Sequence, residues 1–444
     1  MYLSRAKCLF VVLFLYPSTS ALAQTGSGFS NPLNGRENDP YSKYGIGELV
    51  NANNVILKGM GSATSAYENP YYINSDNPAS YASLQLTTFE MGMTASTRVV
   101  TGSLNGVSTS YTTGTASISY MQLGIPLSRK NNAGMCIGFK PVSHVYYNLV
   151  DSTFNTPIGT VYNSNNGEGS LNYAYIGGAG RIKNLSFGVN LGYLFGTIRK
   201  TTAVVPIDTA VTNRAYTTQY TNYTRIGGIY WKAGAIYKAR IDSQYTLRIG
   251  GTLSIQQKIT EHLDAFQISS YNFTDTNAND TTSSLVNSKG KLTMPTSFSI
   301  GLMLSKNDKW NLSVDYTSTM WNGFKSTPDT GMTYGIGSGS SRFSLGGELT
   351  PNINDIRTYS ARMTYRFGLY FGTQNIYLSN TTLPVYGFTG GLSFPIKKST
   401  SHLNTSIDIG RLGATTNNLL QETYVRFSLG MTFNHIWFVQ RKYD

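Results

Sequence analysis

The chain has 444 residues with 45 glycines and 32 tyrosines, and only 13% of its residues are charged. Its formal net charge of +13 is spread along the chain without a basic cluster or a nucleic-acid-binding motif, so the composition excludes a nucleic-acid partner. Beyond residue 23 no stretch approaches the roughly 18 apolar residues that a membrane-spanning helix needs, and such a helix is excluded as well.

The first 23 residues have the pattern of a secretory signal peptide. Arg5 and Lys7 give a positive start, and residues 8–16 form an apolar run that is too short to cross a bilayer. Residues 21–23 read Ala-Leu-Ala, a small-x-small cleavage site. We therefore expect export and a mature chain that begins at Gln24.

A segment of small and polar residues follows. Residues 24–40 are rich in Gly, Ser, Asn and Pro and are predicted to be flexible. Residues 41–83 cannot form a core of their own, so we expect them to pack inside a larger structure. Within them Gly59 and Gly61 allow close contacts that a side chain would forbid. The Asn-Pro pair at 77–78 marks a turn.

From residue 84 onward the hydrophobicity alternates with a period of two. Residues 185–195 place Leu, Phe, Val and Tyr on one face and Ser, Gly and Asn on the other. A soluble β-sandwich would alternate in the same way. Many of these runs have about 10 residues or more, which is long for a globular domain and suits a tilted membrane strand. Fourteen strands are predicted, near residues 84–98, 110–125, 133–149, 169–182, 185–199, 222–239, 245–262, 288–304, 309–319, 341–349, 357–369, 384–396, 402–411 and 422–434.

The connections between these strands alternate in length. Those after even-numbered strands are short, such as 183–184 and 240–244, whereas those after odd-numbered strands include the long segments 200–221 and 263–287. Short periplasmic turns and long extracellular loops are typical of an outer-membrane barrel. We therefore predict an all-β fold, an antiparallel transmembrane β-barrel of fourteen strands over residues 84–434 with a periplasmic tail at 435–444.

Two motifs resemble an outer-membrane transporter family. Residues 59–63, Gly-Met-Gly-Ser-Ala, lead to Asn-Pro-Ala and then to the first strand, and a second run over 294–324 contains Met-Pro, Gly, Trp and Thr-Met-Trp-Asn-Gly-Phe. Together they resemble the long-chain fatty-acid and hydrocarbon transporters of the FadL/OmpP1/TodX type, in a Bacteroidetes-type member. The resemblance implies an N-terminal hatch over residues 41–83 inside the lumen. It assigns hatch roles to Gly59, Gly61, Ala63, Asn77, Pro78 and Ala79.

The same resemblance implies a function. Members of the family take up hydrophobic molecules passively, so the expected partners are a hydrophobic small molecule or lipid, together with the outer-membrane lipids. Loop 263–287 is polar, however, where a capture groove for a long-chain fatty acid would be apolar. Relatives of this barrel also serve as accessory partners of a protein-secretion machine, and that alternative stays open. An open polar porin is a third reading, against which a hatch in the lumen argues.

Residues that could carry catalysis or bind a metal are sparse. The histidines, His144, His262, His402 and His435, have no metal-ligand spacing, so neither an enzyme nor a metal site is expected. Cys136 is alone after the signal peptide and lies in an apolar strand, where we expect it to pack. No cofactor is predicted.

Basic residues on the polar phase of the strands are the candidate ligand-binding groups. The planar guanidinium suits a ligand carboxylate, although paired charges in a wet interior would give the same pattern. The candidates are Arg248, Arg342, Arg362, Arg366 and Arg426.

Proline at position 141 interrupts the third strand. Proline cannot donate to a β-ladder, so Pro141 should force a bulge or leave a neighbouring carbonyl unpaired. By phase, Ile137 and Phe139 face outward, and Val145 and Tyr147 are predicted to continue that phase. The resembling transporters have an inward kink in the third strand through which cargo passes sideways. The resemblance therefore implies a lateral opening at Pro141.

Overall fold

The computed structural model describes residues 38–104, 106–128, 132–155, 159–206, 216–270, 279–306, 309–355, 357–397 and 399–437. The predicted signal peptide, nearly all of the segment 24–40 and most of the tail 435–444 lie outside these residues. Within them no helix is both long and apolar enough to cross a bilayer.

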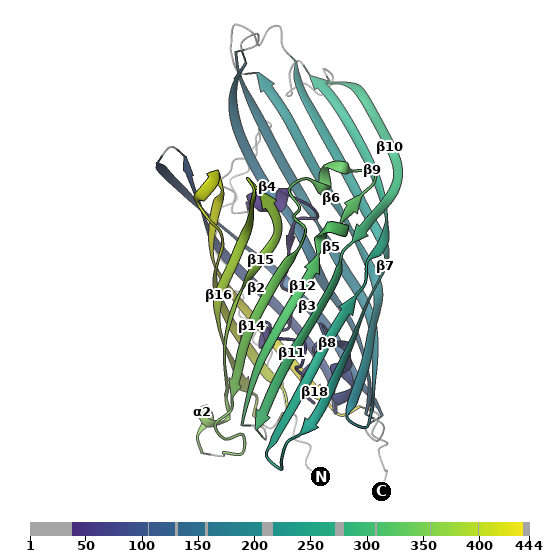
Figure 1. Ribbon diagram of the computed structural model, residues 1–444, viewed down its shortest axis with the longest axis vertical. Helices are drawn as coiled ribbons and strands as arrows, with labels where there is room; N and C mark the ends of the chain where they lie inside the picture. Colours follow the sequence, from purple (N-terminus) through teal and green to yellow (C-terminus); the bar gives the residue numbers. More distant parts are fainter. Residues whose placement is uncertain are drawn as a thin grey trace, which may run out of the picture.

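The strands form one closed antiparallel sheet that is rolled into a barrel (Figure 1). The sheet closes where β18 (Leu420–His435) pairs with β2 (Thr87–Leu104). The other strands of the wall are β3 (Val107–Ser128), β4 (Ala133–Asn155), β5 (Gly159–Ile182), β6 (Leu185–Pro206), β7 (Thr217–Arg240), β8 (Tyr245–Ser254), β9 (Gln257–Ser270), β10 (Asn279–Met294), β11 (Thr296–Lys306), β12 (Trp310–Met320), β14 (Ser340–Leu349), β15 (Thr364–Leu378), β16 (Thr381–Pro395) and β17 (His402–Gly413).

The predicted count of fourteen membrane strands is confirmed. β8 and β9 together form one membrane strand, which is interrupted at residues 255–256, and both pair with β7. β10 and β11 together form another membrane strand, which is interrupted at Pro295 because proline cannot donate to the ladder. Two short strands lie outside the count, β1 (Glu48–Leu49), which pairs with β4, and β13 (Lys325–Ser326), which pairs with β10.

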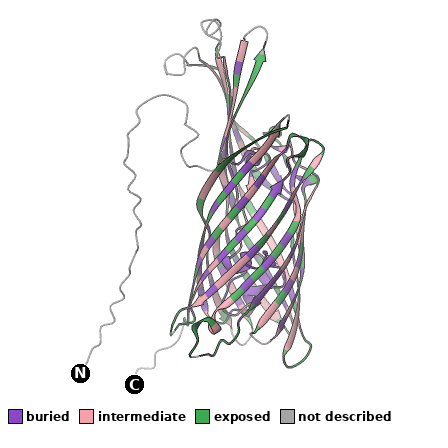
Figure 2. Ribbon diagram, turned by 90° about the vertical axis from the view of Figure 1, so that its left-hand side faces the viewer, coloured by how far each residue is buried: buried purple, intermediate pink, exposed green. Residues whose placement is uncertain are grey.

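Buried and exposed residues alternate along the strands of the wall (Figure 2), as expected where side chains point by turns to the lumen and to the outside. On β2, Glu90 is 1% exposed and its neighbour Met91 is 42% exposed. Closure supplies a partner for the strand backbones, and the outer face is apolar, as a bilayer requires. The same face carries Leu191 on β6, Leu302 on β11 and Phe427 on β18, all exposed.

The predicted outward phase of the upper part of β4 is wrong. The register shifts between Pro141 and Ser143, so a bulge inserts one extra residue into β4. Because side chains alternate with a period of two, one extra residue moves every later side chain to the other face. Ile137 is 47% exposed, whereas Val145 is 1% exposed and packs in an inner apolar cluster.

A predicted strand boundary is also wrong. β15 begins at Thr364 instead of residue 357, and Arg362 ends the short helix α2 (Tyr359–Arg362). This helix projects below the barrel in the connection between β14 and β15 (Figure 1). The Arg362 guanidinium lies over the Tyr359 ring at 5.3 Å, so Arg362 is not part of a lumen-facing strand.

Candidate functional site

The barrel wall is incompletely paired between β3 and β4. Their ladder runs from Ser128↔Ala133 up to Met121↔Phe139 and ends there. Above that level β3 continues to Val107 with β2 as its partner, and β4 continues to Asn155 with β5 as its partner. One edge of each strand is therefore left without a neighbouring wall strand at and above the Pro141 bulge.

The N-terminal part of the described chain occupies this edge of β4. We call residues 38–86 the inner segment and residues 38–50, which lie at the opening, the plug. In the plug, Glu48 and Leu49 form β1 and pair with His144 and Ser143.

Further hydrogen bonds attach the plug to the edge of β4. Asp39 N donates to Tyr146 O at 2.9 Å, and Val50 N donates to Val142 O at 2.9 Å. The plug thus satisfies backbone groups that would otherwise be left unpaired at the opening.

Buried ion pairs also hold the plug. Arg98 on β2 binds Asp39 at 3.2 Å and Glu48 at 2.6 Å, and it also binds Glu422 on β18 at 2.9 Å. Glu48 in addition accepts a hydrogen bond from Arg426 at 2.8 Å. Two acidic residues of the plug are therefore tied to two neighbouring strands of the wall.

Asp39, Glu48 and His144 are close enough together to suggest a metal site. The Arg98 guanidinium already binds both carboxylates, and His144 Nε2 lies 3.2 Å from Glu48. A cation of the protein itself therefore supplies the charge that a metal ion would bring. We interpret Asp39, Glu48, His144 and Arg98 as an ion-paired group that holds the plug, and we call this group the latch.

The remainder of the inner segment is fitted closely against the wall. A Cβ on Gly250 would overlap Ser65 O, and a Cβ on Gly368 would overlap Gly61 N. These glycines allow the backbone of the inner segment to lie directly on the wall. Comparable contacts occur on several other strands, at Gly134, Gly188, Gly234 and Gly346.

The residues predicted for the hatch lie in this closely fitted part. Gly59 is the C-cap of α1 (Val55–Lys58), and Gly61 has a φ of +65°, which favours glycine. Asn77 caps the 3₁₀ helix η2 (Pro78–Ser83), in which its side chain accepts a hydrogen bond from Ala79 N. Ala63 and Ala79 are buried, and Pro78 occupies the first turn of η2.

The second sequence motif supports the inner segment. Asp315 on β12 accepts a hydrogen bond from Ser65 N at 2.6 Å, and Gly301 on β11 faces the same serine. Trp321 and Phe324 lie beyond the end of β12, where both are buried. The motif thus connects the wall both to the inner segment and to the loop above it.

A cavity of about 400 Å³ lies between the inner segment and the wall. Its lining includes Leu49 and Val50 of the plug and Pro141 and Val142 of the β4 bulge. The cavity therefore extends to the unpaired part of the wall. Apolar contributions come from Tyr173, Leu194, Tyr230 and Met294, and the remaining lining includes many Ser, Thr and Asn side chains.

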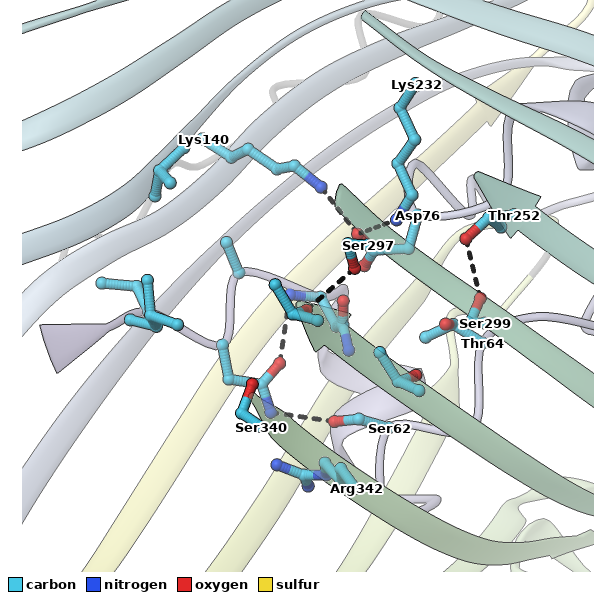
Figure 3. Close-up of a pocket in the computed structure, with 18 of the residues that line it drawn as sticks. Ser62, Thr64, Asp76, Lys140, Lys232, Thr252, Ser297, Ser299, Ser340 and Arg342 are labelled. Carbon is cyan, nitrogen blue, oxygen red and sulfur yellow. Dashed lines mark hydrogen bonds and ion pairs between the residues drawn. The ribbon is translucent and has the colours of Figure 1, made fainter. Parts of the chain in front are cut away.

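Cationic side chains gather around one carboxylate in this cavity. Lys140 Nζ lies 2.9 Å from Asp76, and Lys232 Nζ lies 3.8 Å from it (Figure 3). Burial alone would raise the pKa of Asp76, but the two ammonium groups outweigh it and lower this pKa. Two cations facing one anion leave a local excess of positive charge.

The five candidate arginines have different surroundings. Arg342 lines the cavity, stacks over the Tyr370 ring at 3.8 Å and donates to Gly61 O. Arg366 pairs with Glu348, Arg248 pairs with Glu68, and Arg426 pairs with Glu48 and Asp408. With Arg362 outside the lumen-facing strands, Arg342 is the candidate that the structure places in the cavity.

A lid covers the upper lumen and contacts the plug. It consists of η4 (Trp321–Gly323), β13 and η5 (Thr330–Thr333), and its apolar residues pack with Ile46 of the plug. The rings of Tyr44 and Tyr334 lie 6.1 Å apart. Ser326 donates to the Glu261 carboxylate at 2.9 Å. The lid and the plug therefore form one packed unit.

The latch and the cations of the cavity were not predicted from the sequence. Lys140 and Lys232 were not predicted as site residues, although Lys140 is next to Pro141 in the sequence. Arg98 and Glu422 lie at opposite ends of the chain and meet because β2 and β18 close the barrel. Only the closure register could have revealed that pair.

Comparisons with known proteins agree on the fold. The P. putida toluene transporter TodX shares 15% identity at a TM-score of 0.58, over 86% of this chain and 99% of TodX. A FadL homologue from Pseudomonas aeruginosa shares 11% identity at a TM-score of 0.55, over 87% and 99% of the two chains. The Ralstonia pickettii toluene transporter TbuX shares 14% identity at a TM-score of 0.52, over 86% and 97%. The predicted resemblance is thereby confirmed at the level of the fold.

No curated protein matches the chain. A family model described as BamG, a different name from that of the resembling transporters, matches residues 6–444. Because this match extends over nearly the entire sequence, the chain belongs to the BamG family.

Proposed function

We propose that the protein is a gated outer-membrane channel that takes up hydrophobic or amphiphilic molecules passively and releases them sideways between β3 and β4. The observation that carries the proposal is the position of the cavity. Its lining includes the plug residues Leu49 and Val50 and the bulge residues Pro141 and Val142. A ligand in the cavity would therefore lie beside the wall opening, with the plug as the barrier.

The close fit of the inner segment supports sideways release. Passage straight down the barrel would require residues 54–84 to leave the wall glycines on which they lie. The plug is attached differently, through the edge of β4 and the ion pairs of Arg98. Local release of the plug breaks fewer contacts than release of the whole inner segment, so the side route is favoured.

The lining indicates the class of cargo. Tyr173, Leu194 and Met294 offer apolar contact, while Lys140, Lys232 and Arg342 offer positive charge. This combination suits a molecule with an apolar body and an anionic head, such as a fatty acid. The toluene transporters with a similar fold are named for hydrophobic cargo, which agrees with the proposal.

Photo-labelling tests this function. Vesicles that contain the purified barrel are incubated with a fatty acid that carries a photoreactive diazirine on its chain, and the labelled residues are identified by peptide mapping. We expect labels near Leu49, Val50 and Pro141, and faster delivery of the fatty acid to the bilayer than in protein-free vesicles. Labels confined to the periplasmic mouth near Glu68 would contradict the side route.

One observation favours the second candidate, an accessory barrel of a protein-secretion machine. Among the described residues, the inner segment lies in the lumen against the wall glycines, and the lid packs on the plug. A barrel that serves as a binding partner could keep this state permanently. Vesicles that show no transport with either the native chain or a variant with a weakened plug would favour this candidate.

A further inference from the structure

Exposed cations gather at one end of the barrel, in the short turns between strands. In the outer-membrane orientation proposed above, the short turns face the periplasm. Each of the five such turns of which the structure describes at least one charged residue has an exposed cation. These cations, which we call the basic ring, are Lys183, Arg240, Lys309, Arg357 and Lys397.

Acidic residues do not balance the basic ring within the described part of these turns. Two carboxylates, Asp242 and Asp355, lie in this part against five cations, and the Asp355 carboxylate accepts hydrogen bonds from the backbone N–H groups of Arg357 and Thr358. Two of the cations at the opposite end are paired with acids, in Arg199–Glu168 and Arg225–Asp264. The described part of the periplasmic turns carries an excess of positive charge.

One lysine next to the basic ring lies between two aromatic residues on the lipid-facing wall. Lys306 on β11 is directly opposite Tyr245 on β8 and Trp310 on β12. Its ammonium lies 5.2 Å from the Tyr245 ring centre, and the Tyr245 and Trp310 rings meet edge to face at 6.2 Å. Lys306 continues the outward phase of Ile300 and Leu302, so this group faces the bilayer.

We propose that the basic ring binds anionic phospholipids of the periplasmic leaflet, with Tyr245, Lys306 and Trp310 forming the principal headgroup site. Tyrosine and tryptophan prefer the interfacial depth, where a lysine beside them reaches lipid phosphates. Such a cation attracts anionic lipid through the surface potential. The proposal rests on the outer-membrane location and not on transport.

The distribution of the cations favours a lipid leaflet over an acidic protein. The cations occur in turns around the whole circumference, and a leaflet surrounds a barrel completely whereas a docked protein covers one side. The cations inside the periplasmic mouth are already engaged, since Arg181 and Arg248 both pair with Glu68. The cations that are free to act are therefore those at the lipid boundary.

Native mass spectrometry from nanodiscs of phosphatidylglycerol and phosphatidylcholine in equal amounts tests the proposal. We expect the native barrel to retain phosphatidylglycerol preferentially. Lys306→Gln should lower this preference about fivefold, and combining it with Lys183→Gln, Arg240→Gln and Lys309→Gln should lower it further. The matched control is Lys289→Gln with Lys291→Gln, which removes two exposed cations from β10 and should leave the preference unchanged.

Heat-modifiable migration on gels verifies that each variant is folded. Equal retention of both lipids by the native barrel would overturn the proposal, as would an unchanged preference in the combined variant. The proposal would also be overturned if a purified acidic protein bound to the basic ring and the native barrel showed no preference between the two lipids. Because the readout is lipid retention, failure of the proposed transport function would leave this result unaffected.

Discussion

Arg98 on β2 and Glu48 on β1 form an ion pair of 2.6 Å between the barrel wall and the plug. Both side chains are largely buried, and Arg98 is also within 3.2 Å of Asp39. A buried cation that serves several carboxylates cannot be removed without leaving uncompensated negative charge. We therefore expect this pair to help hold the plug in the opening between β3 and β4.

Removing the guanidinium should release the plug. In Arg98→Gln, Asp39, Glu48 and Glu422 lose their shared cation, and the seated state should be destabilised by about 3 kcal/mol or more. We expect faster proteolysis within residues 38–50 and larger single-channel currents than in the native barrel. Adding Asp39→Asn removes one of the uncompensated charges, since Glu48 keeps its ion pair with Arg426, and should partly restore the native behaviour. Native currents in Arg98→Gln would show that the latch does not hold the plug.

The close fit of the inner segment predicts unequal effects at two neighbouring glycines. Gly368→Ala on β15 would force a methyl group into Gly61 and should destabilise the seated inner segment by about 1–3 kcal/mol. Gly390→Ala on β16 is the matched control, because the nearest atom would lie 3.7 Å from the new methyl group. Thermal unfolding in detergent measures both. Equal stability of the two variants would argue against a rigid inner segment.

We expect Asp76 to compete with an anionic ligand for the lysines of the cavity. Asp76→Asn leaves Lys140 and Lys232 without their carboxylate, so the affinity for laurate should rise several-fold. Lys140→Gln should lower that affinity. Isothermal titration with laurate and with the uncharged dodecanol separates the contribution of the head group. Identical changes for both ligands would place the head group elsewhere.

The lowered pKa of Asp76 predicts a specific pH range. A carboxylate whose pKa is depressed in the folded state stabilises that state above its ordinary value of 3.8, and this stability is lost as the pH falls through the lower folded value. Between pH 5 and pH 8 the contribution of Asp76 should stay constant. Thermal unfolding of the native barrel should show an acid-dependent loss below about pH 4. Asp76→Asn should lack that part of the loss.

The orientation of the barrel is testable on whole cells. A peptide tag at Gly106, in the turn between β2 and β3, should bind antibody without permeabilisation, whereas a tag at Lys183 should require it. No atom lies within 4 Å of a Cβ added at Gly106, so we expect this open turn to accept an insertion. The reverse labelling pattern would invert the assignment of the two ends.

Local sequence patterns predicted the parts of the fold that depend on local chemistry. Alternation identified the strands, and their lengths separated a membrane barrel from a sandwich. The ring of Pro141 predicted an irregularity, and a bulge is found there. The sequence pattern did not give the number of extra residues in the bulge. One extra residue reverses the faces of Val145 and Tyr147.

The candidate site was less predictable because it depends on distant pairs. Arg98 and Glu422 meet through barrel closure, and the pairing of Glu48 with His144 depends on the interrupted ladder between β3 and β4. Arg362 was predicted as a lumen residue because it is an arginine on the polar phase of an expected strand. That strand, β15, begins only after it, at Thr364. The signal-peptide cleavage and the individual roles of the hatch residues stay predictions.

A disulfide across the plug tests the gate most directly. Leu49 and Ser143 are directly paired, so Leu49→Cys with Ser143→Cys, in a Cys136→Ala background, should form a bond between β1 and β4. The matched control is Ser341→Cys with Thr373→Cys, which joins two wall strands that are already paired. In vesicles, we expect oxidation to abolish fatty-acid delivery only in the first variant, and reduction to restore it. Undiminished delivery through the oxidised Leu49–Ser143 variant would contradict the lateral gate.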